Sequence, residues 1–264
     1  MILAMMPATI PLLTLFFAAS IDRKIDIKQD VDYLAVDVRT REVLERHWAD
    51  ADAPIPVGSL VKPFTALAYG GDFPQFVCHG AASGCWLAHG HGRLKFQDAL
   101  ARSCNAYFLN LARGVDPGTL AVVASKFGIP APSADSAEAR IGLGKDWKIP
   151  PIALARAYAE LAARASEPRV AAILGGMREA VYSGTAAGIG RDARVLAKTG
   201  TAPCIADRVA DRVAERSHVG DGFTVVLDPA DAPRTVWLVR VHGVPGAEAA
   251  KSAARVLRAW HTGR

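Results

Sequence analysis

The chain has 264 residues, enough for one large domain or two small ones. Hydrophobic residues make up 51% and charged residues 22%, a balance that fits a globular protein rather than a disordered one. The formal net charge is only +5, and no run of lysine or arginine interleaves with aromatic residues, so no nucleic-acid partner is expected.

The N-terminal segment differs from the rest of the chain. No charged side chain occurs from Ile2 to Ala19, and charges begin just after Ser20. This outline predicts a signal peptide over residues 1–20, cleaved near Ser20. An uncleaved membrane anchor is the second interpretation, because the stretch is close to the length that spans a bilayer. Under both interpretations, the remainder of the chain, residues 21–264, is exported and lies in the periplasm or on the outer face of the cytoplasmic membrane.

The remainder is predicted to be one domain with strands at both ends and helices between them. A helical lobe is expected over about 63–182, and an Ala-rich amphipathic helix closes the chain at 247–260. The order implies a sheet completed by segments far apart in the sequence, with the lobe inserted in the middle. Strands are expected at 32–37, 42–48, 195–201, 223–227 and 235–241, and helical patterns at 96–111 and 155–165.

Ser59 and Lys62 form the first of three short motifs. They stand three residues apart, so a helix would place the hydroxyl and the amine on one face. A serine is a poor nucleophile at neutral pH without a base beside it. A partly buried lysine with a lowered pKa can be that base. The same spacing also occurs by chance on solvated helices, so this motif alone does not decide the matter.

The other two motifs are Ser103-Cys104-Asn105 and Lys198-Thr199-Gly200-Thr201. The first either supplies a hydroxyl for proton relay and an amide for a substrate backbone, or is an ordinary Ser-Asn cap. The second either aligns a cation, two hydroxyls and a side-chain-free glycine along a strand edge that a peptide could follow, or is a turn. Together with the first motif, this order is typical of enzymes that form an acyl-serine.

Longer segments around the motifs resemble the transpeptidase domain of penicillin-binding proteins, most closely the elongation-type class B members. They are residues 58–67, 141–144 with 150–159, and 184–186 with 197–202. The likeness extends from about residue 30 to the C-terminus. It implies an α+β fold, an antiparallel sheet flanked by helices with an inserted all-helical lobe, in agreement with the element order above.

The resemblance also implies catalytic roles for four residues. Ser59 would attack the carbonyl of a D-alanyl-D-alanine stem peptide and carry the acyl group. Lys62 would take its proton. Ser103 would pass a proton to the leaving amine, in a field shaped by Lys198.

Substrate binding is implied for the remaining motif residues. Asn105 would hold the substrate amide, and Thr199 and Thr201 would hold the terminal carboxylate. The backbone N–H groups of Ser59 and Thr201 would form the oxyanion hole. The amine of a second stem would then resolve the acyl-enzyme into a cross-link, whereas water would give carboxypeptidase action.

The cysteines have three open interpretations. Four cysteines in an exported protein first suggest disulfides. Cys78, Cys85, His91 and Cys104, however, are three thiols and an imidazole that suit a closed tetrahedral zinc site. Elongation-type members can carry a metal between the first two motifs, held by Asp, His and Cys, and Cys78 and Cys85 would replace the Asp ligands here. Zinc, a Cys78–Cys85 disulfide and free buried thiols all remain open, and Cys204 is expected to be a bystander.

The predicted function is a D,D-transpeptidase that acts on peptidoglycan stem peptides, binds β-lactams covalently and needs no cofactor for its chemistry. A D,D-carboxypeptidase or β-lactamase of the same fold stays open, as does a non-catalytic β-lactam sensor or scaffold among cell-wall synthesis proteins. Class A β-lactamases deacylate with a Glu-held water, but no E-x-x-L-N pattern lies between Asn105 and Lys198. Class D enzymes typically have Val where Asn105 stands. The charged stretch 207–216 is predicted to be a surface loop beside the site.

Overall fold

The computed structural model describes residues 31–203 and 220–263. The predicted leader, Cys204 and the charged stretch 207–216 lie outside these residues. None of the helices within the described ranges is both long and apolar enough to cross a membrane.

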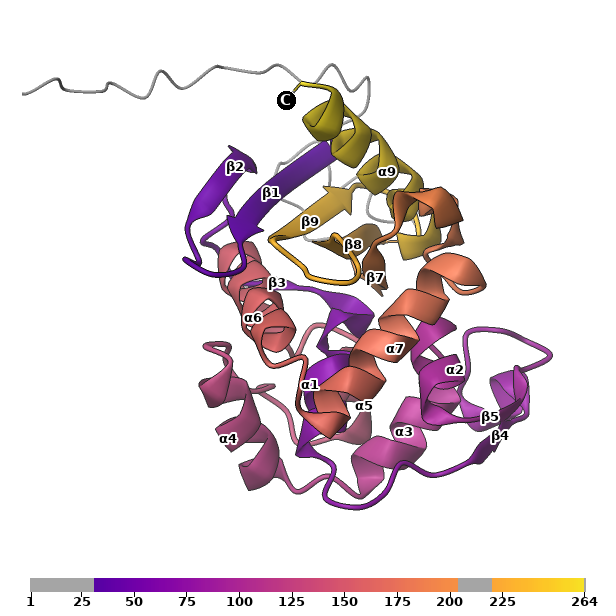
Figure 1. Ribbon diagram of the computed structural model, residues 1–264. Helices are drawn as coiled ribbons and strands as arrows, with labels where there is room; N and C mark the ends of the chain where they lie inside the picture. The colour runs from indigo at the N-terminus through magenta and orange to yellow at the C-terminus, as the bar shows by residue number, and fades with distance from the viewer. Residues whose placement is uncertain (1–30, 204–219, 264) are drawn as a thin grey trace, which may run out of the picture.

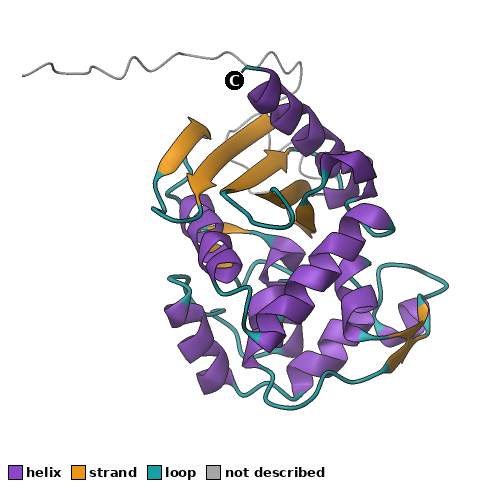
Figure 2. Ribbon diagram, viewed as in Figure 1, coloured by secondary structure: helices purple, strands orange, loops and turns teal. Residues whose placement is uncertain are grey.

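A five-stranded antiparallel sheet forms one half of the molecule (Figures 1 and 2). Its spatial order is β2-β1-β9-β8-β7. Because β1 pairs with β9 from Val31↔Val241 to Asp37↔Thr235, the sheet joins segments from the two ends of the described chain, as predicted. The strands are β1 (Val31–Asp37), β2 (Val43–His47), β7 (Leu196–Ala202), β8 (Asp221–Asp228) and β9 (Thr235–Val241).

Helices cover both faces of this sheet, so its inner strands are buried on both sides. Successive side chains of a strand point to opposite faces. In β9, Val236 and Leu238 pack into the core shared with the helical lobe. Trp237 and Val239 pack into a second core with α9 (Gly246–Thr262) on the opposite face. A strand buried on both faces is mostly apolar, and all of β9 is buried, including its two polar residues, Thr235 and Arg240.

The helical lobe fills the other half of the molecule, below the sheet in Figure 2. It also contains two small two-stranded sheets that the sequence analysis did not predict, β3 with β6 and β4 with β5. The lobe comprises β3 (Ile55–Pro56), η1 (Gly58–Val61), α1 (Lys62–Ala68), β4 (Phe76–Cys78), η2 (Gly80–Ser83), β5 (Gly92–Leu94), α2 (Phe96–Ala101), α3 (Asn105–Arg113), α4 (Pro117–Lys126), α5 (Ala137–Arg140), β6 (Lys148–Ile149), α6 (Pro151–Ala163) and α7 (Pro168–Tyr182). Two short turns, η3 (Ala187–Ile189) and η4 (Arg191–Ala193), lead back to β7.

The predicted helical stretch 96–111 is two helices, α2 and α3, with a break between them. Ser103 interrupts the stretch with a left-handed backbone, φ 51°. The Cys104 N–H donates to Ala99 O at 2.9 Å, which closes the end of α2. The Cys104 thiol then accepts the Tyr107 N–H at 3.5 Å and caps the start of α3. The break places Ser103 and Cys104 between the two helices and Asn105 at the first position of α3.

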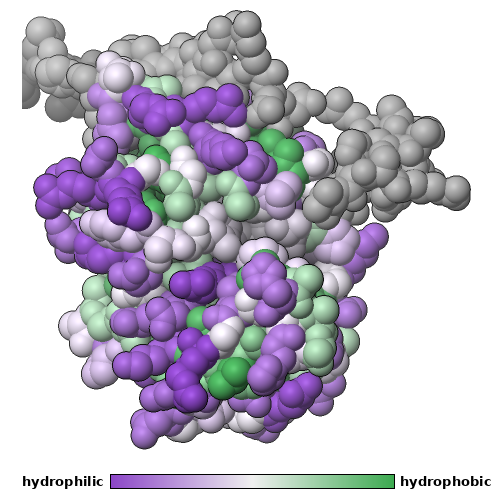
Figure 3. Space-filling view, turned by 90° about the vertical axis from the view of Figure 1, so that its right-hand side faces the viewer, coloured by the Kyte–Doolittle hydropathy of each residue, from purple (hydrophilic) through white to green (hydrophobic). Residues whose placement is uncertain are grey.

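The outer surface is mixed in character. On the face shown in Figure 3, hydrophobic residues form small separate patches among hydrophilic ones. Exposed large hydrophobic side chains in the described ranges are spread over several elements, such as Leu44, Trp86 and Val122. Scattered residues of this kind are normal for a globular protein.

Candidate active site

The nucleophile motif lies where η1 runs into α1, next to strand β7. Gly58 has φ +58°, and a Cβ there would come within 2.3 Å of the Thr201 carbonyl oxygen. Only glycine tolerates both this backbone and this close approach. Tyr158, which is fully buried, donates its hydroxyl to Leu60 O at 2.7 Å and ties the turn to α6. Ser59 is thus held half-buried beside the strand that carries the third motif.

Lys62 is fully buried and faces the second motif. Its Nζ donates to Asn105 Oδ1 at 2.7 Å, to Ser103 O at 2.9 Å and to Ser103 Oγ at 3.4 Å. Burial lowers the pKa of this amine to about 7, against the opposing effect of the nearby thiols of Cys104 and Cys85. A lysine with such a pKa is partly neutral at neutral pH and can accept a proton. No hydrogen bond among the described residues joins Ser59 Oγ to Lys62 Nζ, so that predicted contact is not formed in this structure.

Lys198 approaches the same hydroxyl from β7. Its buried Nζ donates to Ser103 Oγ at 2.9 Å and to Thr199 O at 2.6 Å. Burial, and then the positive charge of Lys62, lower the pKa of Lys198 well below its ordinary value. The Ser103 hydroxyl therefore lies within reach of two buried amines, one from each of the other motifs.

The third motif occupies an edge strand, since β8 is the strand that pairs with β7 in the described sheet. Gly200 lies against the turn before η1, where a Cβ would come within 2.7 Å of Val57 O. The Thr199 hydroxyl donates to Thr185 Oγ1 at 2.5 Å, and Thr185 in turn donates to Ala101 O at 3.2 Å. Thr201 is exposed, and its Oγ1 accepts the Gly246 N–H at 2.9 Å. The hydroxyls of Thr199 and Thr201 thus stand at different depths along one strand.

The four predicted metal ligands meet in one cluster. Their ligand atoms all lie within 4.8 Å of one another. Cys85 Sγ is 3.8 Å from Cys104 Sγ and 3.4 Å from His91 Nδ1, and Cys78 Sγ is 3.7 Å from His91 Nδ1. Tetrahedral zinc with Zn–S near 2.3 Å and Zn–N near 2.0 Å separates its ligand atoms by about 3.5–3.8 Å. The cysteines of the cluster are free, and no Cys78–Cys85 disulfide is formed.

Two contributors to the site were not assigned a role from the sequence. Trp86, 56% exposed, donates its indole N–H to Ser103 O at 3.3 Å and packs edge-on against His91. Thr185 lies within a segment that carries the family resemblance, but its bond to Thr199 appears only in the fold. No spacing or periodicity in the sequence marks an isolated tryptophan in a loop, so only its position in space identifies it.

A family model described as the penicillin-binding protein transpeptidase domain matches residues 79–260. This range contains the second and third motifs, whereas Ser59 and Lys62 precede it and are placed by the structure. No curated protein sequence matches the chain.

Solved structures with a similar fold come from several bacteria. Pseudomonas aeruginosa PBP2, in complex with WCK 5153, has a TM-score of 0.70 at 19% identity, over 88% of this chain and 71% of that one. Helicobacter pylori PBP2, from its complex with MreC, has a TM-score of 0.71 at 14% identity, over 89% and 61%. The transpeptidase domain of the Legionella pneumophila FtsI4 D,D-transpeptidase has a TM-score of 0.63 at 21% identity, over 88% of each chain.

These likenesses confirm the predicted fold class, α+β with an antiparallel sheet and a helical lobe. The family model covers well over half of the sequence and includes two of the three motifs. The chain therefore belongs to the penicillin-binding protein transpeptidase domain family.

Proposed function

We propose that this chain is a D,D-transpeptidase that acts on peptidoglycan stem peptides through an acyl-enzyme on Ser59. The observation that carries the proposal is the convergence of two buried lysines, Lys62 and Lys198, on the Ser103 hydroxyl beside the Ser59 turn. β-Lactams would acylate the same serine. In this proposal the protein acts outside the cytoplasm, because the stem peptides that it cross-links lie there.

Acylation begins with attack of Ser59 Oγ on the carbonyl of the penultimate D-alanine. Lys62, with its pKa lowered to about 7, takes the hydroxyl proton. As the C–N bond to the terminal D-alanine breaks, Ser103 gives its proton to the leaving amine and regains one from the lysine pair. The free amino acid departs, and the acyl group remains as an ester on Ser59.

Binding of the donor peptide uses the edge of β7. An extended peptide can add alongside an unpaired strand edge. Asn105 would hold the substrate amide, and Thr199 and Thr201 its carboxylate. The close packing of Gly58 on Thr201 brings the backbone of η1 next to that of β7. This packing supports an oxyanion hole built from the N–H groups of Ser59 and Thr201, where one donor is worth about 2.7–4 kcal/mol in the transition state.

The proposal is tested with an N-acylated peptide that ends in D-alanyl-D-alanine, incubated with a primary amine. The wild-type chain should release D-alanine and form the amide of the added amine. Ser59→Ala should lower the release of D-alanine by about 1000-fold or more, as loss of a nucleophile does in other acyl-enzymes. Ser125→Ala, an exposed serine of α4, is the matched control and should keep the wild-type rate. Release that persists in Ser59→Ala would overturn the proposal.

We further propose that the cluster of Cys78, Cys85, His91 and Cys104 holds a structural zinc ion. Three thiolates and an imidazole fit this metal in softness and number. The ion would brace the second motif, because Cys104 lies between Ser103 and Asn105 and caps α3. It would take no part in the acyl transfer.

Metal analysis tests this second proposal. Protein purified with zinc present should contain about one zinc per chain, and Cys85→Ser should lose most of it and melt at a lower temperature. Cys204→Ser is the matched control and should retain the metal. Wild-type protein without zinc, or equal zinc in both variants, would contradict the assignment.

The partners in this proposal are stem peptides, β-lactams and other cell-wall synthesis proteins. Support for a protein partner comes from the similar fold of Helicobacter pylori PBP2, whose solved complex contains MreC.

A further inference from the structure

A pair of buried thiols lies directly beside the second motif. Cys85 Sγ is 3.8 Å from Cys104 Sγ, and both cysteines are free. A carboxylate at the position of Cys85 could also hold zinc. Only two thiols, however, can be joined to each other by oxidation. The pair is therefore capable of chemistry that neither metal binding nor the acyl transfer proposed above requires.

Both members of the pair are connected to Ser103. Cys104 is the next residue in the chain, and its thiol caps α3 by accepting the Tyr107 N–H at 3.5 Å. Cys85 is followed by Trp86, whose indole N–H donates to Ser103 O at 3.3 Å. A disulfide holds its sulfurs about 2 Å apart, so the two must approach by about 1.8 Å. Because both thiols are buried, rotation of the side chains alone has little free space. Whichever residue moves, a group next to Ser103 moves with it.

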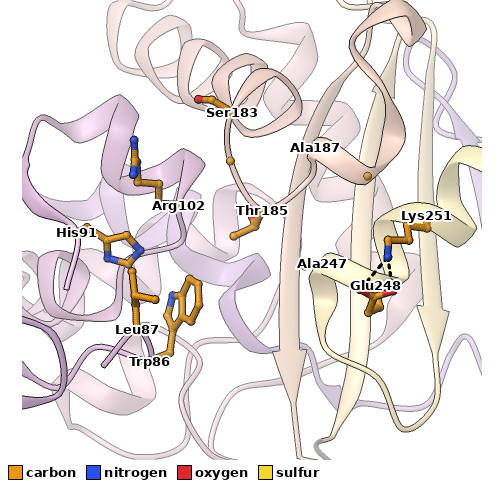
Figure 4. A pocket seen from close by; sticks show the side chains of 12 residues that line it. Trp86, Leu87, His91, Arg102, Ser183, Thr185, Ala187, Ala247, Glu248 and Lys251 are labelled. Carbon is orange, nitrogen blue, oxygen red and sulfur yellow. Dashed lines mark hydrogen bonds and ion pairs between the residues drawn. The ribbon is translucent and has the colours of Figure 1, made fainter. Parts of the chain in front are cut away.

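A small oxidant can reach this pair from a pocket. Figure 4 shows Trp86 and His91 at one wall of a pocket of about 420 Å³. His91 Nδ1 is 3.4 Å from Cys85 Sγ, so the pocket ends beside that thiol. Cys85 is 7% exposed, compared with 2% for Cys78 and 0% for Cys104. Since thiol oxidation follows exposure, Cys85 is the cysteine of the cluster that an oxidant meets first.

We propose that Cys85 and Cys104 are an oxidation site for hydrogen peroxide, and that their disulfide switches acylation off by displacing Ser103. The Cys85 thiolate attacks one peroxide oxygen, and the O–O bond breaks to give a sulfenic acid and hydroxide. The Cys104 thiolate then attacks the sulfenic sulfur and expels a second hydroxide. Two electrons pass from the sulfurs to the peroxide, and two protons convert both hydroxides to water.

The disulfide also removes two of the four ligands that the cluster offers to a metal, so zinc is released with it. The reaction is reversible, because a dithiol reduces the disulfide and restores both ligands. The inference rests on the proposed zinc site and acyl-serine function, and it adds a regulation of that same site by oxidants.

Peroxide treatment of the zinc-loaded chain tests the switch with three measurements. Peptide mapping by mass spectrometry without reduction should find Cys85 joined to Cys104. A chromogenic chelator should detect about one released zinc per chain. The rate of acylation by a fluorescent penicillin should fall by about tenfold or more, the effect of a displaced catalytic group. Dithiothreitol followed by zinc should restore the rate.

Two aspartate variants separate the thiol pair from the rest of the cluster. Cys85→Asp keeps a group that can bind metal but cannot form the disulfide, so peroxide should leave its acylation rate unchanged. Cys78→Asp is the matched control, because it alters the ligand set in the same way and keeps the pair. Its rate should fall after peroxide as in the wild type. Each variant is compared with its own untreated sample, so a lower starting rate does not affect the result.

Three outcomes would overturn the switch. They are a treated wild-type chain without the Cys85–Cys104 disulfide, a disulfide that leaves the acylation rate unchanged, and a fall in the rate of Cys85→Asp equal to that of Cys78→Asp. An untreated wild-type chain that penicillin does not acylate would instead overturn the proposed function. Peptide mapping does not depend on acylation, so it distinguishes the two failures.

Discussion

Ser103 is the residue on which the three motifs meet. The two amines within reach of its hydroxyl are both buried, and the charge of Lys62 lowers the pKa of Lys198. Two cations this close are not both stable away from water, so a proton is readily given up. A hydroxyl between them is suited to moving a proton in either direction, as both acylation and its reverse require.

The pKa of Lys62 gives a test at this scale. Below about pH 7 the amine is protonated and cannot take the proton of Ser59; above it, the amine is neutral. We expect the rate of acylation by a fluorescent penicillin to rise as the pH increases through about 7 and then to level off. The rate is measured from about pH 5 to about pH 9. A rate that does not change over this range would contradict the role of Lys62 as the base.

Much of the site could be predicted from residue spacing, because its chemistry depends on residue types in a fixed order. The structure brings Lys62, Ser103, Asn105 and Lys198 together. The expected Ser59–Lys62 contact was not found, since the lysine amine is engaged by the second motif instead. Trp86 was missed because its contact with Ser103 depends on the path of a loop, which local sequence does not encode.

At the scale of elements, the site depends on how closely β7 packs on the η1 turn. Because Gly58 and Gly200 have no side chain, the backbone of β7 and the backbone around η1 can come into close contact there. The strands were predicted well: β9 has the predicted bounds, because its β-branched and aromatic residues favour a strand and turn residues flank it. The helical stretch 96–111 was predicted less well. Apolar spacing continues across its break, and only the backbone at Ser103 interrupts it.

A comparison of alanine substitutions at two glycines tests this packing. Both Gly58 and Gly144 have positive φ, but a Cβ at Gly58 would meet Thr201 O at 2.3 Å, whereas one at Gly144 meets nothing within 4 Å. Gly144→Ala should cost about 1 kcal/mol in the free energy of unfolding, the strain of the left-handed backbone alone. Gly58→Ala should cost about 2–4 kcal/mol and slow acylation, because strain and a backbone clash add. Urea denaturation measures the free energy of unfolding of both variants. Equal losses of stability in Gly58→Ala and Gly144→Ala would contradict the account.

At the scale of the whole molecule, charged groups tie together strands from distant parts of the chain. His242, just after β9, lies 3.1 Å from Asp221 of β8 and 3.5 Å from Asp32 of β1. Arg240 also pairs with Asp32, at 2.6 Å. Hydrogen bonds to Asp221 and then to Asp32 raise the pKa of His242 to about 9. The closure of the sheet therefore has an electrostatic component as well as an apolar core.

This network predicts how stability depends on pH. A raised histidine pKa adds stability that is fully present below the unfolded value of 6.5 and is lost as the pH rises through about 9. The side chain of His242 is 41% exposed, so solvent screening limits the effect to about 1 kcal/mol or less. Wild-type protein should lose this increment of unfolding free energy between about pH 6.5 and about pH 9, and His242→Gln should not. An identical pH dependence in the two proteins would show that the network contributes nothing.

The central claim is that Ser59 forms a covalent acyl-enzyme, and mass spectrometry after incubation with a penicillin tests it most directly. The account predicts a mass increase of one penicillin per chain, located on the peptide that contains Ser59 and absent from Ser59→Ala. No adduct on folded, zinc-containing protein, or an adduct on a different residue, would contradict the account.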